Sequence, residues 1–143
     1  MSHVDEMLMM GRRVLASQPF SVLLGAELLV FAEGVAELKA PITAQVKQQH
    51  GFAHGGVISY LADNALTFAG GSALGSAVVT SEFKINYLRP GIGEFIIARA
   101  TVVHAGANQA VCRCDVYASD GGTEKLCATA QGTIVKVAKV AGR

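Results

Sequence analysis

The stretch HGGVISYLADNA, from His54 to Ala65, decides the fold of this chain. Its pattern predicts a helix that begins after Gly56 and runs to about Ala69, with almost only apolar or small residues. A helix that is apolar on all sides is normally buried. We therefore expect a central helix that is enclosed by the rest of the chain.

Two polar features interrupt this apolar helix. Asp63 stands in its middle, and because burying a carboxylate without partners is costly, such a residue is either paired or used. The helix is preceded by His54-Gly55-Gly56, and glycine allows a ligand to approach the backbone closely. The free N–H groups of a first helical turn form a site for an anion or an oxyanion.

The spacing of these two features bears on the number of chains in the site. Gly55 and Asp63 lie eight positions apart, which is about 12 Å along a helix axis. One small reacting group cannot contact both on the same helix. If both act on one substrate atom, they come from two copies of the chain, which predicts a site shared across a homodimer.

The composition sets the broad class of protein. The 143 residues are enough for one domain with a proper core, from residue 1 to 143. Hydrophobic residues make up 51% and charged residues 16%, with a mean hydropathy of +0.39, which indicates a large buried interface between chains. A net charge of +1 without a basic cluster argues against nucleic acid as a partner.

Compartment and metal binding are also constrained. No apolar run reaches the ~18 residues that a membrane span needs, and residues 1–6 do not have the pattern of a signal peptide. We expect a cytoplasmic protein with no membrane contact. The odd set of Cys112, Cys114 and Cys127 does not predict a disulfide framework, and no Cys or His spacing is typical of zinc.

The flanking patterns predict strands around the central helix. An N-terminal helix is expected over 4–17, within an N-terminal segment 1–19, and two strands over 23–31 and 35–40. The glycines at 70, 71 and 75 are expected to end the central helix. Four strands follow, over 78–88, 94–104, 109–118 and 123–137, and residues 138–143 are expected to be a frayed tail.

The short turns between the last four strands favour an antiparallel meander. The predicted fold class is therefore α+β, with an antiparallel sheet of about six strands wrapped around one long central helix, plus the N-terminal helix.

Two motifs together resemble a known family. The first is Gln48 followed by His54-Gly55-Gly56 and Asp63, and the second is the run TSEFKINYLRP, residues 80–90. From about residue 20 to 137 the chain resembles the hotdog-fold acyl-CoA thioesterases of the phenylacetate-degradation (PaaI-like) family. The resemblance implies hydrolysis of an acyl- or aryl-acyl-coenzyme A without a cofactor. It also implies homodimers that pair their sheets edge to edge, usually assembled as a homotetramer, with active sites at the dimer interface.

The resemblance assigns roles to residues of this chain. The backbone N–H of Gly55 would hold the thioester carbonyl oxygen, and Asp63 of the other subunit would act as nucleophile or as general base for water. His54 would help to shape the pocket. A hydroxyl on the following strand, Thr80 with Ser81 as the alternative register, would assist the water or the carboxylate.

One position departs from the family pattern. Gln48 stands where the family commonly has Asn, and its amide, which extends one methylene further, would donate to the thioester oxygen or position water from a different depth. Substrate contacts are expected from Gly56 and Asn64, with Asn64 facing the sheet or the other subunit. The phosphates of coenzyme A need basic groups, and Arg89 and Lys84 are the candidates. The candidates for the apolar acyl pocket are Phe52, Tyr60, Leu61 and Phe68.

Other interpretations stay open. Asp63 can be a buried carboxylate satisfied at an interface, and His54 a neutral histidine bonded to backbone. A Ser-His-Asp triad is rejected, because no Gly-x-Ser-x-Gly elbow occurs and His54 lies roughly 13 Å from Asp63 along the helix. The rival functions are an acyl-CoA hydratase or dehydratase on the same fold and a non-catalytic acyl-CoA-binding module.

Overall fold

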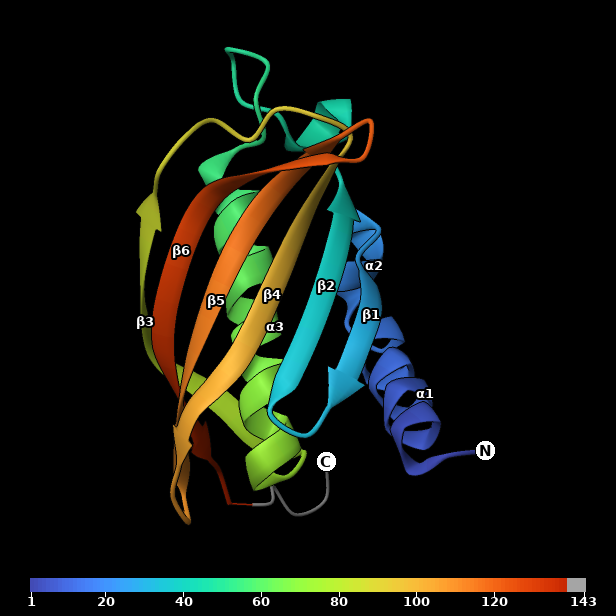
Figure 1. The fold of residues 1–143 in the computed structure, drawn as a ribbon, viewed down its shortest axis with the longest axis vertical. Helices are drawn as coiled ribbons and strands as arrows, with labels where there is room; N and C mark the ends of the chain where they lie inside the picture. The colour runs from blue at the N-terminus through green and yellow to red at the C-terminus, as the bar shows by residue number, and fades with distance from the viewer. Residues whose placement is uncertain (139–143) are drawn as a thin grey trace.

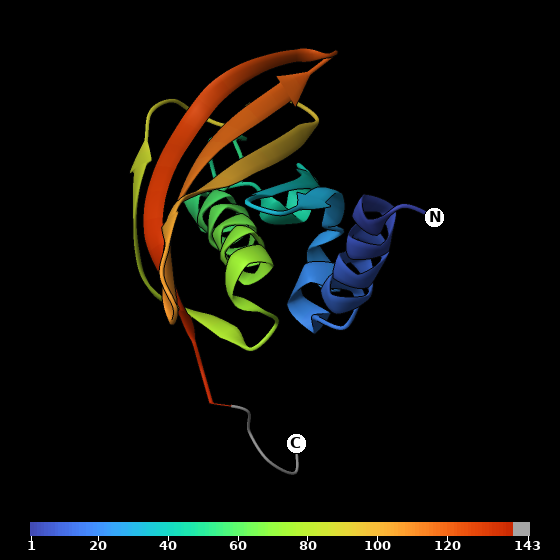
Figure 2. The same ribbon diagram turned by 60° about the horizontal axis from the view of Figure 1, so that its bottom comes forward.

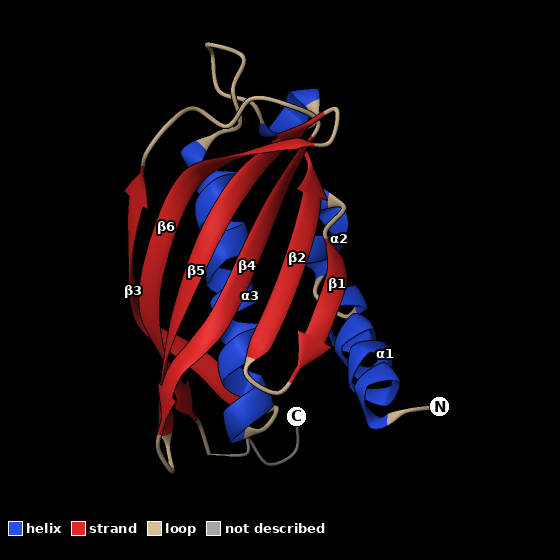
Figure 3. Ribbon diagram, viewed as in Figure 1, coloured by secondary structure: helices blue, strands red, loops and turns tan. Residues whose placement is uncertain are grey.

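Six strands form one antiparallel sheet in the computed structural model, which describes residues 1–138 (Figure 1). Their order across the sheet is β1-β2-β4-β5-β6-β3. The strands are β1 (Glu27–Ala32), β2 (Val35–Pro41), β3 (Val78–Tyr87), β4 (Phe95–Ala105), β5 (Gln109–Asp120) and β6 (Thr123–Lys136). One long helix, α3 (Gly55–Leu74), crosses the inner face of the sheet (Figure 3). The predicted α+β fold with a central helix is confirmed.

The sheet curves around α3, as Figure 2 shows, and the main core lies between them. Leu61, Ala65 and Leu66 of the helix are fully buried against sheet residues such as Leu38 and Ile134. The helix is apolar on most sides because the curved sheet meets it over a wide arc. This enclosure fixes the position of every side chain that α3 carries.

The helix is longer than predicted, because Gly70 and Gly71 lie inside it rather than at its end. A Cβ atom added at Gly70 would lie 2.6 Å from the Cβ of Ile134 on β6, so glycine allows close packing of helix on sheet. The helix ends at Leu74 and is capped by Gly75, whose φ of 105° lies in the region that favours glycine.

The predicted meander is right for β4, β5 and β6 and wrong for β3. Strand β3 pairs with β6 at the edge of the sheet, so the connection 88–94 crosses over the ends of β5 and β6 instead of forming a hairpin (Figure 1). The connection is anchored in the middle, where Ala53 N donates to Gly91 O at 2.9 Å. This contact places the crossover beside the loop that leads into α3.

The N-terminal region contains two helices instead of one. Helix α1 (His3–Ala16) begins in a capping box made by Ser2 and Asp5, close to the predicted start. The predicted strand over 23–31 is wrong in its first part, because α2 (Pro19–Leu24) precedes it. Pro19 occupies the first turn of α2, and Gly25 caps its end at a φ of 70°.

Both N-terminal helices lie beside β1 and next to α3 (Figure 2). None of the helices in residues 1–138 is long and apolar enough to cross a membrane. Of the predicted tail 138–143, residues 139–143 lie outside the described residues.

Candidate active site

One side of α3 is left uncovered by the sheet. Its half-exposed residues recur every three or four positions and so share one face: Ser59, Tyr60, Asp63, Asn64 and Thr67. This face lies between the edge strand β3 and the N-terminal helices. The residues on one side of the face contact β3, and those on the other side contact the N-terminal helices. The polar side chains that are candidates for catalysis lie along this face of α3.

Asp63 is held by a hydroxyl from β3. Thr80 Oγ1 donates to Asp63 Oδ1 at 2.6 Å, and Thr67 Oγ1 lies 2.9 Å from Thr80 Oγ1 and 2.8 Å from the Asp63 backbone oxygen. Each hydroxyl has a single hydrogen, so two hydrogens serve three short contacts. Because Thr80 donates to the carboxylate, it fixes the orientation of the Asp63 side chain. Thr67 supports this pair from one turn further along α3.

A β-bulge in β3 decides between the two hydroxyls considered from the sequence. Thr80 pairs with Ile134 and Glu82 with Thr133, so Ser81 is the extra residue of the bulge. Ser81 is exposed, and its hydroxyl donates to the Thr133 backbone oxygen at 3.3 Å. The bulge reverses the alternation of side chains along the rest of β3. It thereby brings Tyr87 onto the same side as Thr80.

The N-terminus of α3 is a second polar centre. His54 is the N-cap, and its Nδ1 accepts from Gly56 N at 2.7 Å; a Cβ at Gly56 would lie 2.9 Å from that nitrogen. Tyr87 OH donates to Gly55 O at 3.0 Å and holds the first turn against β3. The Gly55 N–H has no hydrogen-bond partner within residues 1–138, so it is a free donor at the positive end of the helix.

The role of Tyr87 was missed in the sequence, although the tyrosine belongs to the run that carries the resemblance. Only its distance to Gly55 identifies it as the residue that supports the helix start.

The loop before α3 is held by hydrogen bonds between its own residues. Gln48 Oε1 accepts from His50 N, and Gln48 N donates to Phe52 O at 2.9 Å. Gln48 and Phe52 are half-buried, with the Phe52 ring 6.1 Å from the His50 ring. The Gln48 amide oxygen is therefore engaged within its own loop, and its amide nitrogen is the group that remains to donate.

Asn64 and Tyr60 contact the N-terminal helices. Asn64 was expected to face the sheet or another subunit, but its Nδ2 donates to Gln18 Oε1 at 3.0 Å. Tyr60 OH donates to the buried Ser21 Oγ at 2.5 Å, and its ring meets Phe20 edge-on. These contacts depend on the position of α2, a helix that the sequence pattern did not predict. Leu61 and Phe68 are buried in the core, and Phe68 also borders a cavity.

The two predicted basic residues lie apart. Lys84 is exposed on the outer side of β3, whereas Arg89 lies in the crossover and lines a cavity of about 390 Å³. Lys125, on β6, lines the same cavity together with Asp120. Lys125 was not singled out in the sequence, because the hairpin that carries it is distant from Arg89 along the chain.

Several groups away from the uncovered face of α3 have shifted pKa values. Burial raises the pKa of Cys112 and Cys127 to about 11 and that of Cys114 to about 12, so these thiols stay protonated at neutral pH and are poor nucleophiles. On the outer face of the sheet, the hydrogen bonds from Arg99 to Glu124 raise the pKa of Arg99 and lower that of Glu124. No group of three metal-ligating side chains occurs in the described part of the chain.

Comparison with known proteins places the chain among thioesterases. The family model described as the thioesterase superfamily matches residues 50–125. A protein of Haemophilus influenzae described as a putative esterase is 33% identical over 113 residues, or 78% of this chain and 80% of the relative. The acyl-coenzyme A thioesterase PaaI of Escherichia coli is 38% identical over 89 residues, or 62% of this chain and 63% of the relative.

Solved structures agree with these matches. The E. coli PaaI structure superposes with a TM-score of 0.85 and 26% identity, covering 96% of this chain and 97% of that one. A thioesterase family protein from Silicibacter pomeroyi gives a TM-score of 0.83 and 36% identity over 88% of this chain and 94% of its own.

Proposed function

The chain belongs to the thioesterase superfamily, and we propose that it hydrolyses the thioester of an acyl- or aryl-acyl-coenzyme A to the free acid and coenzyme A. One observation carries the proposal: α3 presents a free Gly55 N–H at its start and the half-exposed Asp63 carboxylate, held by Thr80, at its middle. Thioester hydrolysis needs one donor for the carbonyl oxygen and one carboxylate facing the carbonyl carbon. The coenzyme A ester is suggested by the activity named for the E. coli relative.

The Gly55 N–H and the Asp63 carboxylate have different roles in the proposed reaction. The Gly55 N–H donates to the carbonyl oxygen as negative charge develops there, and such a donor lowers the barrier by about 3–4 kcal/mol. Asp63 either takes a proton from the attacking water or attacks the carbonyl carbon itself, forming an anhydride that water then opens. In both routes the C–S bond breaks when the tetrahedral intermediate collapses, and the sulfur leaves as the thiol after gaining a proton. Thr80 orients the carboxylate throughout.

Gly55 and Asp63 of one helix are about 12 Å apart, so the proposed site takes them from two subunits. Strand β3 offers the surface for this pairing, because within residues 1–138 it is bonded to β6 on one side only. An unpaired strand edge is a template for another strand. Val79 and Tyr87 on β3 and the adjacent Leu88 are 47%, 53% and 52% exposed, and a second copy would cover them. A homotetramer would combine two such dimers.

Coenzyme A would bind with its phosphates toward Arg89. The cavity of about 390 Å³ next to Arg89 also has Lys125 and Asp120 in its wall. Its two cations outnumber the one carboxylate, and they suit the phosphates better than Lys84, which lies on the outer side of β3. Arg89 follows Tyr87 by two positions, which links this cavity to the start of α3.

The test is thiol release from a panel of short, medium, long and aromatic acyl-CoAs, with wild type and Asp63→Asn side by side. The substitution keeps the shape of the side chain and removes the carboxylate, so release should fall at least ~100-fold. Asp115→Asn is the matched control, because Asp115 also accepts from a threonine hydroxyl, that of Thr129 at 2.7 Å, but lies on β5 away from the uncovered face of α3. Its activity should stay within about twofold of wild type.

Absence of thiol release from every wild-type reaction would refute the proposal. Loss of the conjugated absorbance of an enoyl-CoA without thiol release would then indicate a hydratase. Saturable acyl-CoA binding without turnover would indicate a binding module.

A further inference from the structure

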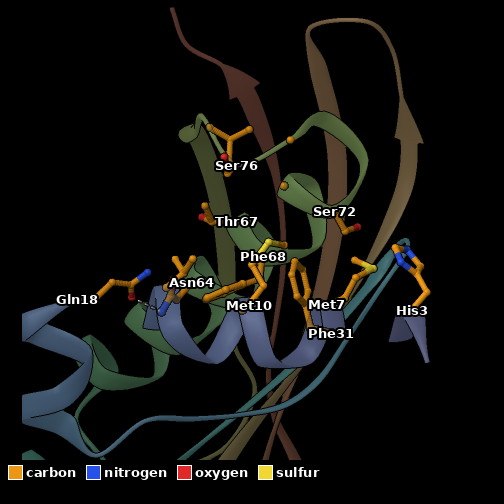
Figure 4. Close-up of a pocket in the computed structure, with 15 residues that line it drawn as sticks. His3, Met7, Met10, Gln18, Phe31, Asn64, Thr67, Phe68, Ser72 and Ser76 are labelled. Atoms are coloured by element: carbon orange, nitrogen blue, oxygen red, sulfur yellow. Dashed lines mark hydrogen bonds between the residues drawn. The ribbon is translucent and has the colours of Figure 1, made fainter. Parts of the chain in front are cut away.

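A cavity of about 440 Å³ lies between α1 and the uncovered side of α3. Its wall is mostly apolar, and Figure 4 shows the side chains of Met7, Met10, Phe31 and Phe68 gathered there. This volume lies within the range of pockets for small ligands, which are typically lined by apolar groups with a few polar ones. The cavity is separate from the one beside Arg89.

One end of the cavity is linked to the proposed catalytic carboxylate through two threonine hydroxyls. Asn64 and Thr67 line one end, and Thr67 Oγ1 lies 2.9 Å from Thr80 Oγ1, which donates to Asp63. Gly75 and Ser76 line the other end, at the last turn of α3. A chain that enters beside Asp63 would therefore run along α3 toward its C-terminal end.

The length of the cavity follows from the helix that forms its wall. Asn64 and Gly75 are eleven positions apart, which is roughly 16 Å along the axis. An extended chain advances about 1.2 Å per bond, because a residue of three bonds spans about 3.6 Å. The cavity thus has room for roughly a dozen bonds in a line, well beyond a short acyl group or a single ring with a one-carbon arm. The flexible methionines of α1 suit a chain that has no fixed shape.

We propose that this cavity binds the acyl chain of the substrate, and that the preferred substrates are linear, medium-chain acyl-CoAs of roughly eight to twelve carbons. This inference rests on the proposed thioesterase function, since it takes Asp63 as the point where the thioester lies. It adds α1 to the parts of the molecule that determine specificity.

Gly71 offers a way to shorten the cavity. It lines the middle of the wall, and an added Cβ would lie 3.5 Å from Val78 Cγ2, an ordinary contact that the helix can accept. A leucine at this position would extend into the cavity and leave roughly 10 Å between Asn64 and the obstruction. Met10→Trp would obstruct it from the opposite wall, on α1.

The experiment compares kcat/KM for dodecanoyl-CoA and butanoyl-CoA in wild type, Gly71→Leu and Met10→Trp. The ratio of the two values should fall more than tenfold in both variants, because each buried methylene is worth about fourfold in binding. Ala73→Leu is the control: Ala73 is exposed on the same helix and does not line the cavity, so its ratio should match wild type. Calorimetric titration measures the affinity of the cavity for dodecanoate without turnover. Both cavity variants should bind dodecanoate at least tenfold more weakly than wild type.

The outcomes separate the two proposals. Thiol release with an unchanged ratio and unchanged dodecanoate binding in both variants would overturn the cavity assignment and leave the thioesterase proposal intact. A wild-type preference for butanoyl or aromatic acyl-CoA over dodecanoyl-CoA would also overturn it. A third outcome is a protein that hydrolyses no acyl-CoA but binds dodecanoate, with weaker binding in both variants. This outcome would support the proposal that the cavity binds an acyl chain and would refute the proposed thioesterase function.

Discussion

At the scale of single residues, the proposed oxyanion donor can be removed without disturbing its helix. Gly55 is the first residue of α3, where proline is well tolerated because the N–H there has no partner within the helix. His54 before it is already extended, at φ −62° and ψ 139°, as a residue before proline must be. Gly55→Pro therefore deletes one N–H and leaves the helix start in place. We expect kcat/KM for thiol release to fall by about 10²–10³-fold.

Gly55→Ala is the control for this variant. Its Cβ meets the Tyr87 ring at the same 3.3–3.5 Å as that of proline would, but the N–H remains. Its activity should stay within tenfold of wild type, with a melting temperature close to that of Gly55→Pro. Equal losses of activity in the two variants would mean that crowding against Tyr87, not the missing donor, is responsible.

The sequence indicates the candidate site residues more completely than the side chains that each of them contacts. The sequence singled out Asp63, the two glycines and a hydroxyl on the next strand as candidates, because residue type and helix spacing are local properties. It left Thr80 and Ser81 as alternatives, since the bulge that decides between them depends on how β3 pairs with β6. The expectation that Asn64 faces the sheet is wrong for a similar reason, because Gln18, which its amide contacts, lies on a segment that packs against α3 only in the folded chain.

At the scale of elements, two adjacent glycines of α3 should respond in opposite ways to alanine. Gly70→Ala would place a Cβ 2.6 Å from Ile134 Cβ on β6, and overpacking of this kind costs about 1–3 kcal/mol. Gly71→Ala meets only Val78 Cγ2 at 3.5 Å and gains up to about 1 kcal/mol of helix propensity. Urea unfolding should therefore show Gly70→Ala to be less stable than wild type and Gly71→Ala as stable or more stable. Equal stabilities of the two variants would contradict the close packing of α3 on β6.

The strength of the local sequence signals explains which elements could be predicted. The strands and the central helix were located because alternation and apolar runs are strong local signals. Helix α2 was missed because its apolar residues, Val22 to Leu24, continue toward a true strand and resemble its beginning. The Pro19 and Gly25 boundaries were the signals that could have identified it. The place of β3 at the sheet edge was not predictable from turn length, since connection 88–94 is short enough for a hairpin and long enough to cross two strands.

At the scale of the whole molecule, the uncovered face of α3 and the free edge of β3 lie side by side. Thr80 and Tyr87 of this edge strand contact the two polar centres of α3. A second copy that pairs along β3 would therefore cover both centres at once. Because Gly55 and Asp63 of one chain are about 12 Å apart, the proposed site is complete only in that assembly.

This shared site predicts that two inactive variants restore activity when they are mixed. In a dimer of Asp63→Asn with Gly55→Pro, one site combines the intact Gly55 of the first chain with the intact Asp63 of the second. The other site lacks both groups. Random mixing makes half of the dimers mixed, each with one working site of two, so co-expression should recover about a quarter of wild-type activity.

Mixed dimers isolated with two different affinity tags should reach about half of wild-type activity. The control is co-expression of two differently tagged Asp63→Asn chains, which contain no intact carboxylate in any pairing. If each site instead used Gly55 and Asp63 of the same chain, every site in the mixed dimer would lack one group, and its activity would be no higher than that of either variant alone. Mixed dimers without recovered activity would thus refute the shared site, while the single variants would still report whether each group takes part in the hydrolysis.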